Sequence, residues 1–175
     1  MCWQPSANGR IGSGIADIPT LRKAGIRIGM GSDDQSCSDL SDPFQNLRLG
    51  LYSIRSLYKD ATILTPREVL HYHTLGAADI LGIASKVGSL AVGKFADFVV
   101  VDPRHPDTGP VHDPLATFVL ACSLRNLKRV YVAGTLVADG PDLVGFDEAG
   151  MRAEVDQRVA RLQAAAGRLP SLDLT

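Results

Sequence analysis

The segment GIRIGMGSDDQS, residues 25–36, constrains the fold of this chain more than any other stretch of its sequence. Apolar residues alternate with Arg27 and with glycines up to Met30, a pattern typical of a strand that is crowded by its neighbours inside a sheet. A Gly-Ser pair ends this strand, and two carboxylates, Asp33 and Asp34, follow directly. The segment therefore predicts an interior strand that carries acidic groups at its carboxyl end.

Helices are predicted on both sides of this strand. Residues 18–24 predict a short helix that Gly25 ends, and Asp42-Pro43 has the composition of a capped helix start. A strand between helices is typical of an α/β fold, which places its chemistry at the carboxyl ends of parallel strands. Asp33 is either such a functional carboxylate or a simple loop cap, and the segment alone favours neither. Asp34 is expected to be the loop or capping partner.

Two further helical segments and one loop are predicted in the first half. The helix after Asp42 keeps one face apolar up to Tyr58, and Thr65-Pro66-Arg67-Glu68 starts a second helix that runs to Leu81. The glycine- and serine-rich residues 5–14 are expected to form an ordered loop that passes close to another group.

From Val87 onward the hydrophobic period changes from helical to strand-like. Residues 87–102 predict two strand segments joined by a Gly-Lys turn, the second over residues 98–101, and residues 129–138 predict a hairpin around Gly134. A helix is expected near residues 115–122, and a final amphipathic helix over residues 147–167. The strands are expected to form a small separate sheet.

The composition excludes several classes of protein. A chain of 175 residues with 45% hydrophobic and 21% charged residues is typical of a globular protein with one domain or parts of two. The net charge of −1, with basic residues scattered singly, provides no field that would gather phosphates, so nucleic acid is not an expected partner. No apolar run reaches the about 18 residues of a membrane span, and no signal peptide is recognised.

The three cysteines, Cys2, Cys37 and Cys122, are far apart and form no CxxC pair. They indicate neither a disulfide framework nor a structural zinc site, and a reducing cytoplasm is the expected location.

The histidines and Ser13 give weaker signals. His71 and His73 lie in a predicted helix, where residues two apart diverge by roughly 200°, so we expect one packed and one exposed histidine and no joint chelation. His105 and His112 are expected at the surface. Ser13 has no neighbouring His and Asp that would make a catalytic triad.

Five segments of the sequence occur in an order and spacing that resemble a known family. They are PSANGRIGSGI, AGIRIGMGSDD, LTPREVLHYHTLGAADILGI, VGSLAVGKFADFVVVD and LKRVYVAGTLV. From about Trp3 to Gly140 the chain resembles the C-terminal part of the amidohydrolase superfamily, and most closely its cytosine, guanine and triazine deaminase and chlorohydrolase group. Residues 88–102 are the most specific part of the match.

The resemblance implies an α/β fold, the C-terminal portion of a distorted (β/α)8 TIM-like barrel together with part of a small β-sandwich built from both chain ends. Residues 1–84 would be the end of the barrel, residues 85–140 the sandwich segment, and residues 141–175 a C-terminal helix. Family members carry one or two divalent metals, commonly zinc or iron, at the carboxyl ends of the barrel strands.

By position, Asp33 matches the family's metal-binding aspartate after the eighth strand, which also acts as the proton shuttle between water and the leaving amine. Asn8, Gly12, Ser13 and Gly14 match the loop after the seventh strand, which borders the substrate pocket. The implied activity is hydrolysis of a C–N or C–Cl bond in a purine, pyrimidine or triazine.

The sequence departs from the family pattern in that loop. Trp3 and Gln4 stand where the family often has Cys and His, Ala7 replaces a serine, and Asp17 replaces a common proline.

The family's other metal-binding residues have no counterpart in these 175 residues. These are the first-strand His-x-His, the later histidines and a glutamate. A catalytic zinc uses about three protein ligands and a water, so Asp33 alone is expected to bind zinc weakly or not at all. The expected partners are a small-molecule substrate, the missing N-terminal barrel portion and further copies of the chain. The alternative is a catalytically silent remnant or interaction module, whose open barrel edge would bind a partner.

Overall fold

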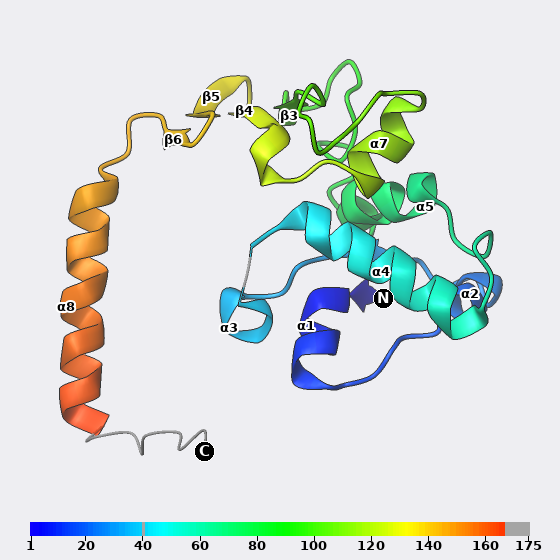
Figure 1. The fold of residues 1–175 in the computed structure, drawn as a ribbon, viewed down its shortest axis with the longest axis horizontal. Coiled ribbons are helices and arrows are strands. Elements are labelled where there is room, and N and C mark those ends of the chain that lie inside the picture. The colour runs from blue at the N-terminus through cyan, green and yellow to red at the C-terminus, as the bar shows by residue number, and fades with distance from the viewer. Residues whose placement is uncertain (40, 167–175) are drawn as a thin grey trace.

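The computed structural model describes residues 1–39 and 41–166 and has α/β architecture, as predicted (Figure 1). Two short strands form a parallel sheet in which Cys2 pairs with Gly29 and Trp3 with Met30. The strands are β1 (Cys2–Trp3) and β2 (Gly29–Met30), with helices α1 (Pro5–Ile11) and α2 (Ile18–Lys23) between them and α3 (Gln35–Ser38) and α4 (Pro43–Tyr58) after them. The strand predicted over residues 26–30 is thus shorter than expected, and it consists of the two residues that pair with β1.

The ordered loop predicted for residues 5–14 is wrong over most of its length, because Pro5–Ile11 form the helix α1. Pro5 occupies the first helical turn, where a missing N–H is harmless, and Gly12 ends the helix in the left-handed conformation (φ 70°). Turn-forming residues therefore mark the two ends of a helix here.

Helix α4 covers both strands of the parallel sheet. Asp42 caps it as predicted, since its carboxylate accepts the N–H groups of Phe44 and Gln45. A Cβ added at Gly50 would lie 2.9 Å from both Met30 Cε and Trp3 Cη2, so the helix backbone packs directly against the strands. The buried cluster gathers around this contact, and it consists of Trp3, Ile18, Ile28, Met30, Leu47, Leu51, Ile54, Leu64, Val69, Tyr72 and Val119.

The second capped helix forms as predicted but contains a π-helical turn. Thr65 and Glu68 make the reciprocal capping box, and the helix runs as α5 (Pro66–His71), η1 (Tyr72–Gly76) and α6 (Ala77–Ile80). A Cβ added at Gly29 would lie 2.7 Å from the Cα atom of Ala77, so β2 touches the helix backbone. This close approach requires a glycine in the strand.

A four-stranded antiparallel sheet follows, in the order β3-β4-β5-β6. The predicted hairpin is confirmed, with Ala133 and Gly134 in the left-handed region at its turn, and the rings of Phe98 and Tyr131 stack at 4.5 Å. The strands are β3 (Phe98–Val101), β4 (Leu127–Val132), β5 (Thr135–Asp139) and β6 (Asp142–Leu143). The closed barrel and the sandwich remain predictions.

The strand predicted before the Gly-Lys turn is wrong. The Lys94 ammonium donates to the Val87 carbonyl (3.2 Å) and to Ser89 Oγ (2.8 Å), which folds this segment into successive turns. Gly88 and Gly93, with φ near 90°, bend the backbone in a way that a regular strand does not allow. Leu90 therefore remains exposed instead of pairing in the sheet.

Helix α7 (Pro114–Leu120) confirms the helix expected near residues 115–122 and connects the two parts of the fold. Arg48 of α4 donates from Nη1 to the carbonyl oxygen of Cys122 (2.5 Å) and more weakly to that of Val119 (3.4 Å). The Val119 carbonyl belongs to the last turn of α7, where helix carbonyls lack intrahelical partners, and the Cys122 carbonyl follows the helix directly after its C-cap. Arg48 thus ties α7 to the helix that covers the parallel sheet.

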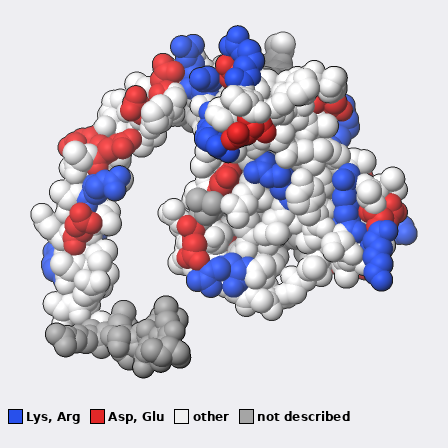
Figure 2. All heavy atoms as spheres, in the orientation of Figure 1, with Lys and Arg blue, Asp and Glu red and all other residues white. Residues whose placement is uncertain are grey.

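Helix α8 (Glu148–Ala166) stands apart from the rest of the molecule (Figure 1). The apolar stripe predicted for it is exposed along its whole length, at Met151, Val155, Val159 and Leu162. The helix end predicted at Gly167 lies outside the described residues. None of the helices within residues 1–39 and 41–166 has the length and apolarity needed to cross a membrane. Figure 2 shows acidic and basic side chains interspersed over the visible face.

Candidate functional site

Asp33 lies three residues beyond β2, at the carboxyl end of the parallel sheet. Its side chain is exposed, its φ is 65°, and its Oδ1 accepts the N–H of Asp34 at 2.9 Å. A non-glycine residue in the left-handed region costs on the order of 1 kcal/mol or more, although Asp tolerates it better than most, and such residues are concentrated at functional sites. The structure therefore places this carboxylate at the edge where the sequence predicted it.

Asp34 is a capping residue, as predicted. Its Oδ1 accepts the N–H groups of Ser36 (2.8 Å) and Cys37 (3.1 Å) at the start of α3, and also the Ser36 hydroxyl. Hydrogen bonds to the ionised form, first of all from the Ser36 hydroxyl, hold the pKa of Asp34 below its usual value. The Oδ1 atom of Asp34 is therefore occupied by local hydrogen bonds.

Asp33, Asp34 and Cys37 form a group of potential metal ligands whose donor atoms lie within 4.8 Å of one another. Asp34 Oδ1 makes the capping bonds, so Asp33 and the Cys37 thiol are the two members of the group that cap no helix. A zinc site uses about three protein ligands, which is more than these two side chains supply. Cys37 was not among the predicted site residues. Its spacing of three from Asp34, one turn of a helix, was the available signal.

The residues of the predicted pocket loop lie together at the end of α1. Asn8 Nδ2 donates to Ser13 Oγ (2.9 Å), and the Ser13 N–H donates to the Asn8 carbonyl (3.0 Å). Gly12 and Gly14 both have positive φ and open space around them. This turn is therefore ordered by its own side chains and faces solvent in the described part of the chain.

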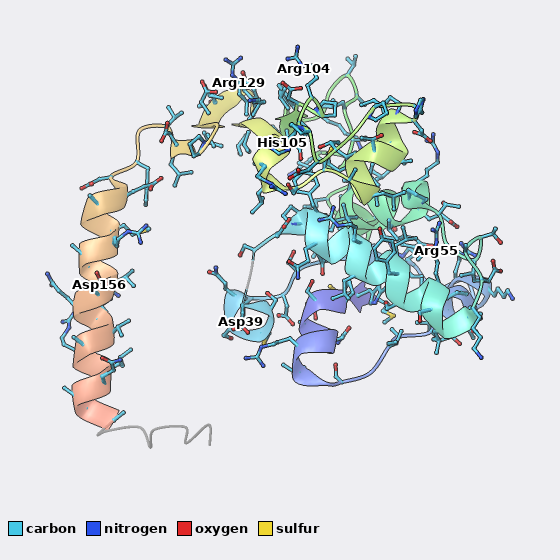
Figure 3. All side chains as sticks on the ribbon, viewed as in Figure 1. Asp39, Arg55, Arg104, His105, Arg129 and Asp156 are labelled. Carbon is cyan, nitrogen blue, oxygen red and sulfur yellow. The ribbon has the colours of Figure 1, made fainter. Side chains whose placement is uncertain are left out.

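The α1 turn and the Asp33 segment lie at the same edge of the parallel sheet. Arg10, near the end of α1, forms an ion pair with Asp39, which follows α3 (Figure 3). Both side chains are more than half exposed, so solvent screens the pair and it contributes little to stability. It nevertheless shows that the two segments following β1 and β2 are neighbours.

A buried side chain behind this edge connects the same two segments. Asn46 of α4 is 1% exposed; its Oδ1 accepts the Ser6 N–H (3.1 Å) and its Nδ2 donates to the Gly31 carbonyl (3.0 Å). An unsatisfied buried polar group costs roughly 1–3 kcal/mol, so both backbone groups depend on this amide. The sequence analysis missed Asn46, because its partners lie 40 and 15 residues away along the chain.

The histidines lie away from this edge. His71 is exposed and His73 is packed, as predicted, and burial lowers the pKa of His73. Its Nε2 is buried without a hydrogen-bond partner and lines a cavity of about 280 Å³ that also borders Val99 and Phe118. His105 and His112 lie in the loop before α7; His112 is exposed and His105 is half-exposed near Asp107. None of these four side chains extends the Asp33 group.

Comparisons with known proteins found one matching family model, and similar sequences and structures. The amidohydrolase family model matches residues 1–137. An S-triazine hydrolase of Gordonia rubripertincta is 31% identical over 94% of this chain. A 5-methylthioadenosine/S-adenosylhomocysteine deaminase of Bacillus thuringiensis is 32% identical over 82% of it. A zinc-bound adenosine deaminase structure from Xanthomonas campestris superimposes with a TM-score of 0.87 and 28% identity over 93% of the chain.

This chain spans only about a third of these proteins. It covers 35% of the triazine hydrolase, 33% of the methylthioadenosine deaminase and 37% of the adenosine deaminase chain. The similarity therefore concerns one segment of each relative.

Proposed function

Because this chain belongs to the amidohydrolase family, we propose that it is the C-terminal portion of a metal-dependent hydrolase that acts on a heterocyclic amine. The single observation that carries the proposal is the position of Asp33. It lies at the carboxyl end of a parallel strand, in a left-handed conformation, inside the matched segment. The substrate class, a purine, pyrimidine or triazine, is suggested by the names of the relatives.

In the proposed reaction Asp33 transfers protons. Its carboxylate accepts a proton as water attacks the ring carbon, and it then donates that proton to the amine as the C–N bond breaks. With a chlorinated substrate, chloride leaves instead and the proton passes to solvent. A divalent metal, zinc or iron, supplies the acidification of water that makes this attack possible at neutral pH. The exposure of Asp33 in the described part of the chain leaves its carboxylate free to contact an ion and a substrate.

The turn at the end of α1 is proposed to border the substrate. Asn8 and Ser13 present an amide and a hydroxyl, groups that can exchange hydrogen bonds with ring nitrogens and exocyclic amines. At Gly12 and Gly14 an added Cβ would meet no atom within 4 Å, so there is space for a flat ring to approach the backbone closely.

The remaining metal ligands are proposed to come from the portion of the protein that the relatives have and this chain does not. Asp33 and Cys37 alone fall short of a zinc site, and the chain spans about a third of each relative. The second candidate is an interaction module. It is favoured by the parallel sheet, in which neither β1 nor β2 has a second partner within residues 1–39 and 41–166.

The coding sequence upstream of Met1 tests the proposal. We expect an in-frame segment with a strand that ends in His-x-His and two further histidines. We expect the extended protein to bind zinc stoichiometrically and to release ammonia from a heterocyclic amine. Asp33→Asn should lower that rate by about 100-fold or more. Asp156→Asn, on the exposed α8, is the matched control and should leave the rate unchanged (Figure 3).

Two results would favour the interaction module instead. One is an upstream sequence without these histidines, and the other is an extended protein whose activity survives Asp33→Asn. The isolated 175-residue chain is expected to contain no stoichiometric zinc by elemental analysis.

A further inference from the structure

Two asparagines, Asn46 and Asn126, are the buried polar residues within the described part of the chain, and they are 1% and 3% exposed. Asn126 serves the loop near the antiparallel sheet, where its amide donates to the Asp102 carbonyl and to Thr108 Oγ1, both at 3.0 Å. Asn46 serves the parallel sheet. The two residues have the same chemistry and similar burial, so Asn126 is a natural control for the effect of replacing the buried amide of Asn46.

The partners of Asn46 are backbone groups at the carboxyl ends of the two parallel strands. Its oxygen accepts the N–H of Ser6, in the first turn of α1, which begins directly after β1. Helix N–H groups at this position have no intrahelical acceptor, so the side chain takes the place of a cap. No side chain caps α1 at Gln4, which makes Asn46 the side chain that satisfies this helix start.

The other partner of Asn46 determines where the Asp33 segment begins. Gly31 follows β2, its N–H donates to the Trp3 carbonyl of β1 (2.9 Å), and its own carbonyl accepts from Asn46 Nδ2 (3.0 Å). Both hydrogen-bonding groups of Gly31 are thus held by neighbours on different elements. Asp33 is two residues further on and exposed, so the last fixed point of its backbone is the peptide that Asn46 holds.

Asparagine is the residue type that suits this position. Its amide offers an acceptor and a donor on one short side chain, which match a facing N–H and a facing carbonyl. An ionised carboxylate would place a second acceptor against the Gly31 carbonyl. A leucine would fill the space but leave both backbone groups without partners.

We propose that Asn46 is a positioning residue for Asp33: by holding Ser6 and Gly31 together it fixes the Asp33 backbone relative to the α1 turn. This inference rests on the proposed function of Asp33, because only a carboxylate that acts on a bound substrate needs that placement. Asn46 itself contacts neither substrate nor metal in this proposal.

The test uses the 175-residue chain and amide NMR spectroscopy with Asn46→Asp and Asn46→Leu. At neutral pH Asn46→Leu should speed hydrogen exchange at the Ser6 amide by about tenfold or more, because its acceptor is lost, whereas Asn46→Asp keeps an acceptor for Ser6 and loses the donor to the Gly31 carbonyl. Both variants should shift the amide signals of Asp33 and Asp34. Asn126→Asp and Asn126→Leu, the matched controls, should destabilise the protein but leave those three signals at their wild-type positions.

Acidification distinguishes positioning from simple packing. When the introduced carboxyl of Asn46→Asp is protonated, it regains the donor that the Gly31 carbonyl needs, and burial raises the pH at which this occurs. The Asp33 and Asp34 signals should therefore return toward their wild-type positions as the pH falls in Asn46→Asp, relative to wild type at the same pH, and should not return in Asn46→Leu.

The wild-type chain provides a measurement that does not depend on a variant folding. A through-hydrogen-bond coupling between the Ser6 amide nitrogen and the Asn46 side-chain carbonyl is expected, and its absence would overturn the proposal. Unchanged Asp33 and Asp34 signals in folded Asn46 variants, or equal shifts in the Asn126 controls, would also overturn it. The proposed function fails separately, if Asp33→Asn leaves the activity of the extended protein intact.

Discussion

The parallel sheet with its helices and the antiparallel sheet differ in how their side chains are buried. Every residue of the buried cluster except Val119 lies between Trp3 and Tyr72. In β3 to β6 no side chain is fully buried, although the four strands pair in one antiparallel ladder and Phe98 stacks on Tyr131. Backbone pairing and core formation are therefore separate properties. The antiparallel sheet has pairing without a buried core, whereas the region that contains Asp33 has both.

The strongest test of this difference is to remove apolar volume from each region and compare the losses in the free energy of unfolding. Leu51→Ala, at a position that is 0% exposed in α4, should lower the free energy of unfolding by about 2–5 kcal/mol through lost burial and a residual cavity. Val132→Ala in β4, at a position 52% exposed, should change it by about 0.5 kcal/mol. Urea denaturation followed by circular dichroism measures both. Equal losses would show that the antiparallel sheet is buried in solution.

A second substitution asks whether the tight packing extends to the glycines of the parallel sheet. Gly29→Ala should cost about 1–3 kcal/mol, because the new methyl group would lie 2.7 Å from the Ala77 Cα atom. Gly9→Ala in α1, where the nearest atom is Leu49 Cδ2 at 3.8 Å, is the matched control. It should be neutral or stabilise by up to about 1 kcal/mol through helix propensity. A Gly29 variant as stable as the control would contradict the packing described here.

The smallest expected effect concerns the junction of the two regions, where His73 faces Val99 and Phe118. Burial lowers the pKa of His73 below 6.5 in the folded state, so between that value and 6.5 the unfolded chain binds more protons. Stability should therefore fall as the pH decreases below about 6.5. His73→Gln should remove this part of the pH dependence, and the exposed His71→Gln should retain it. Urea midpoints at pH 5 to 8 measure the difference, and identical profiles for the two variants would contradict the assignment.

The sequence predicted those parts of the fold that are encoded locally. Asp42 and Thr65 cap helices because their partners lie two or three residues away, and Gly134 marks its turn by backbone conformation alone. The strand predicted before Gly93 failed because apolar alternation cannot show whether a partner strand is present. α1 was missed because its composition resembles that of a loop.

The candidate site was predicted to a similar extent. Asp33 and Asp34 could be placed after the strand because a strand followed by acidic residues is a local pattern, and Asp34 caps α3 as expected, while the catalytic role of Asp33 stays a prediction. Asn46 could not, since a polar residue in an amphipathic helix resembles any residue near its solvent face. Its importance comes from partners that folding brings together across 40 residues of chain.

Two side chains that are two positions apart in α4 form hydrogen bonds in different directions. Asn46 binds the strand ends and Arg48 binds the end of α7, and side chains two residues apart in a helix diverge by about 200°. An inserted or deleted residue between them would turn one of the two side chains away from its partner by about 100°. Natural length variation in this protein should therefore collect in the connection before Asp42 and be absent from the first two turns of α4.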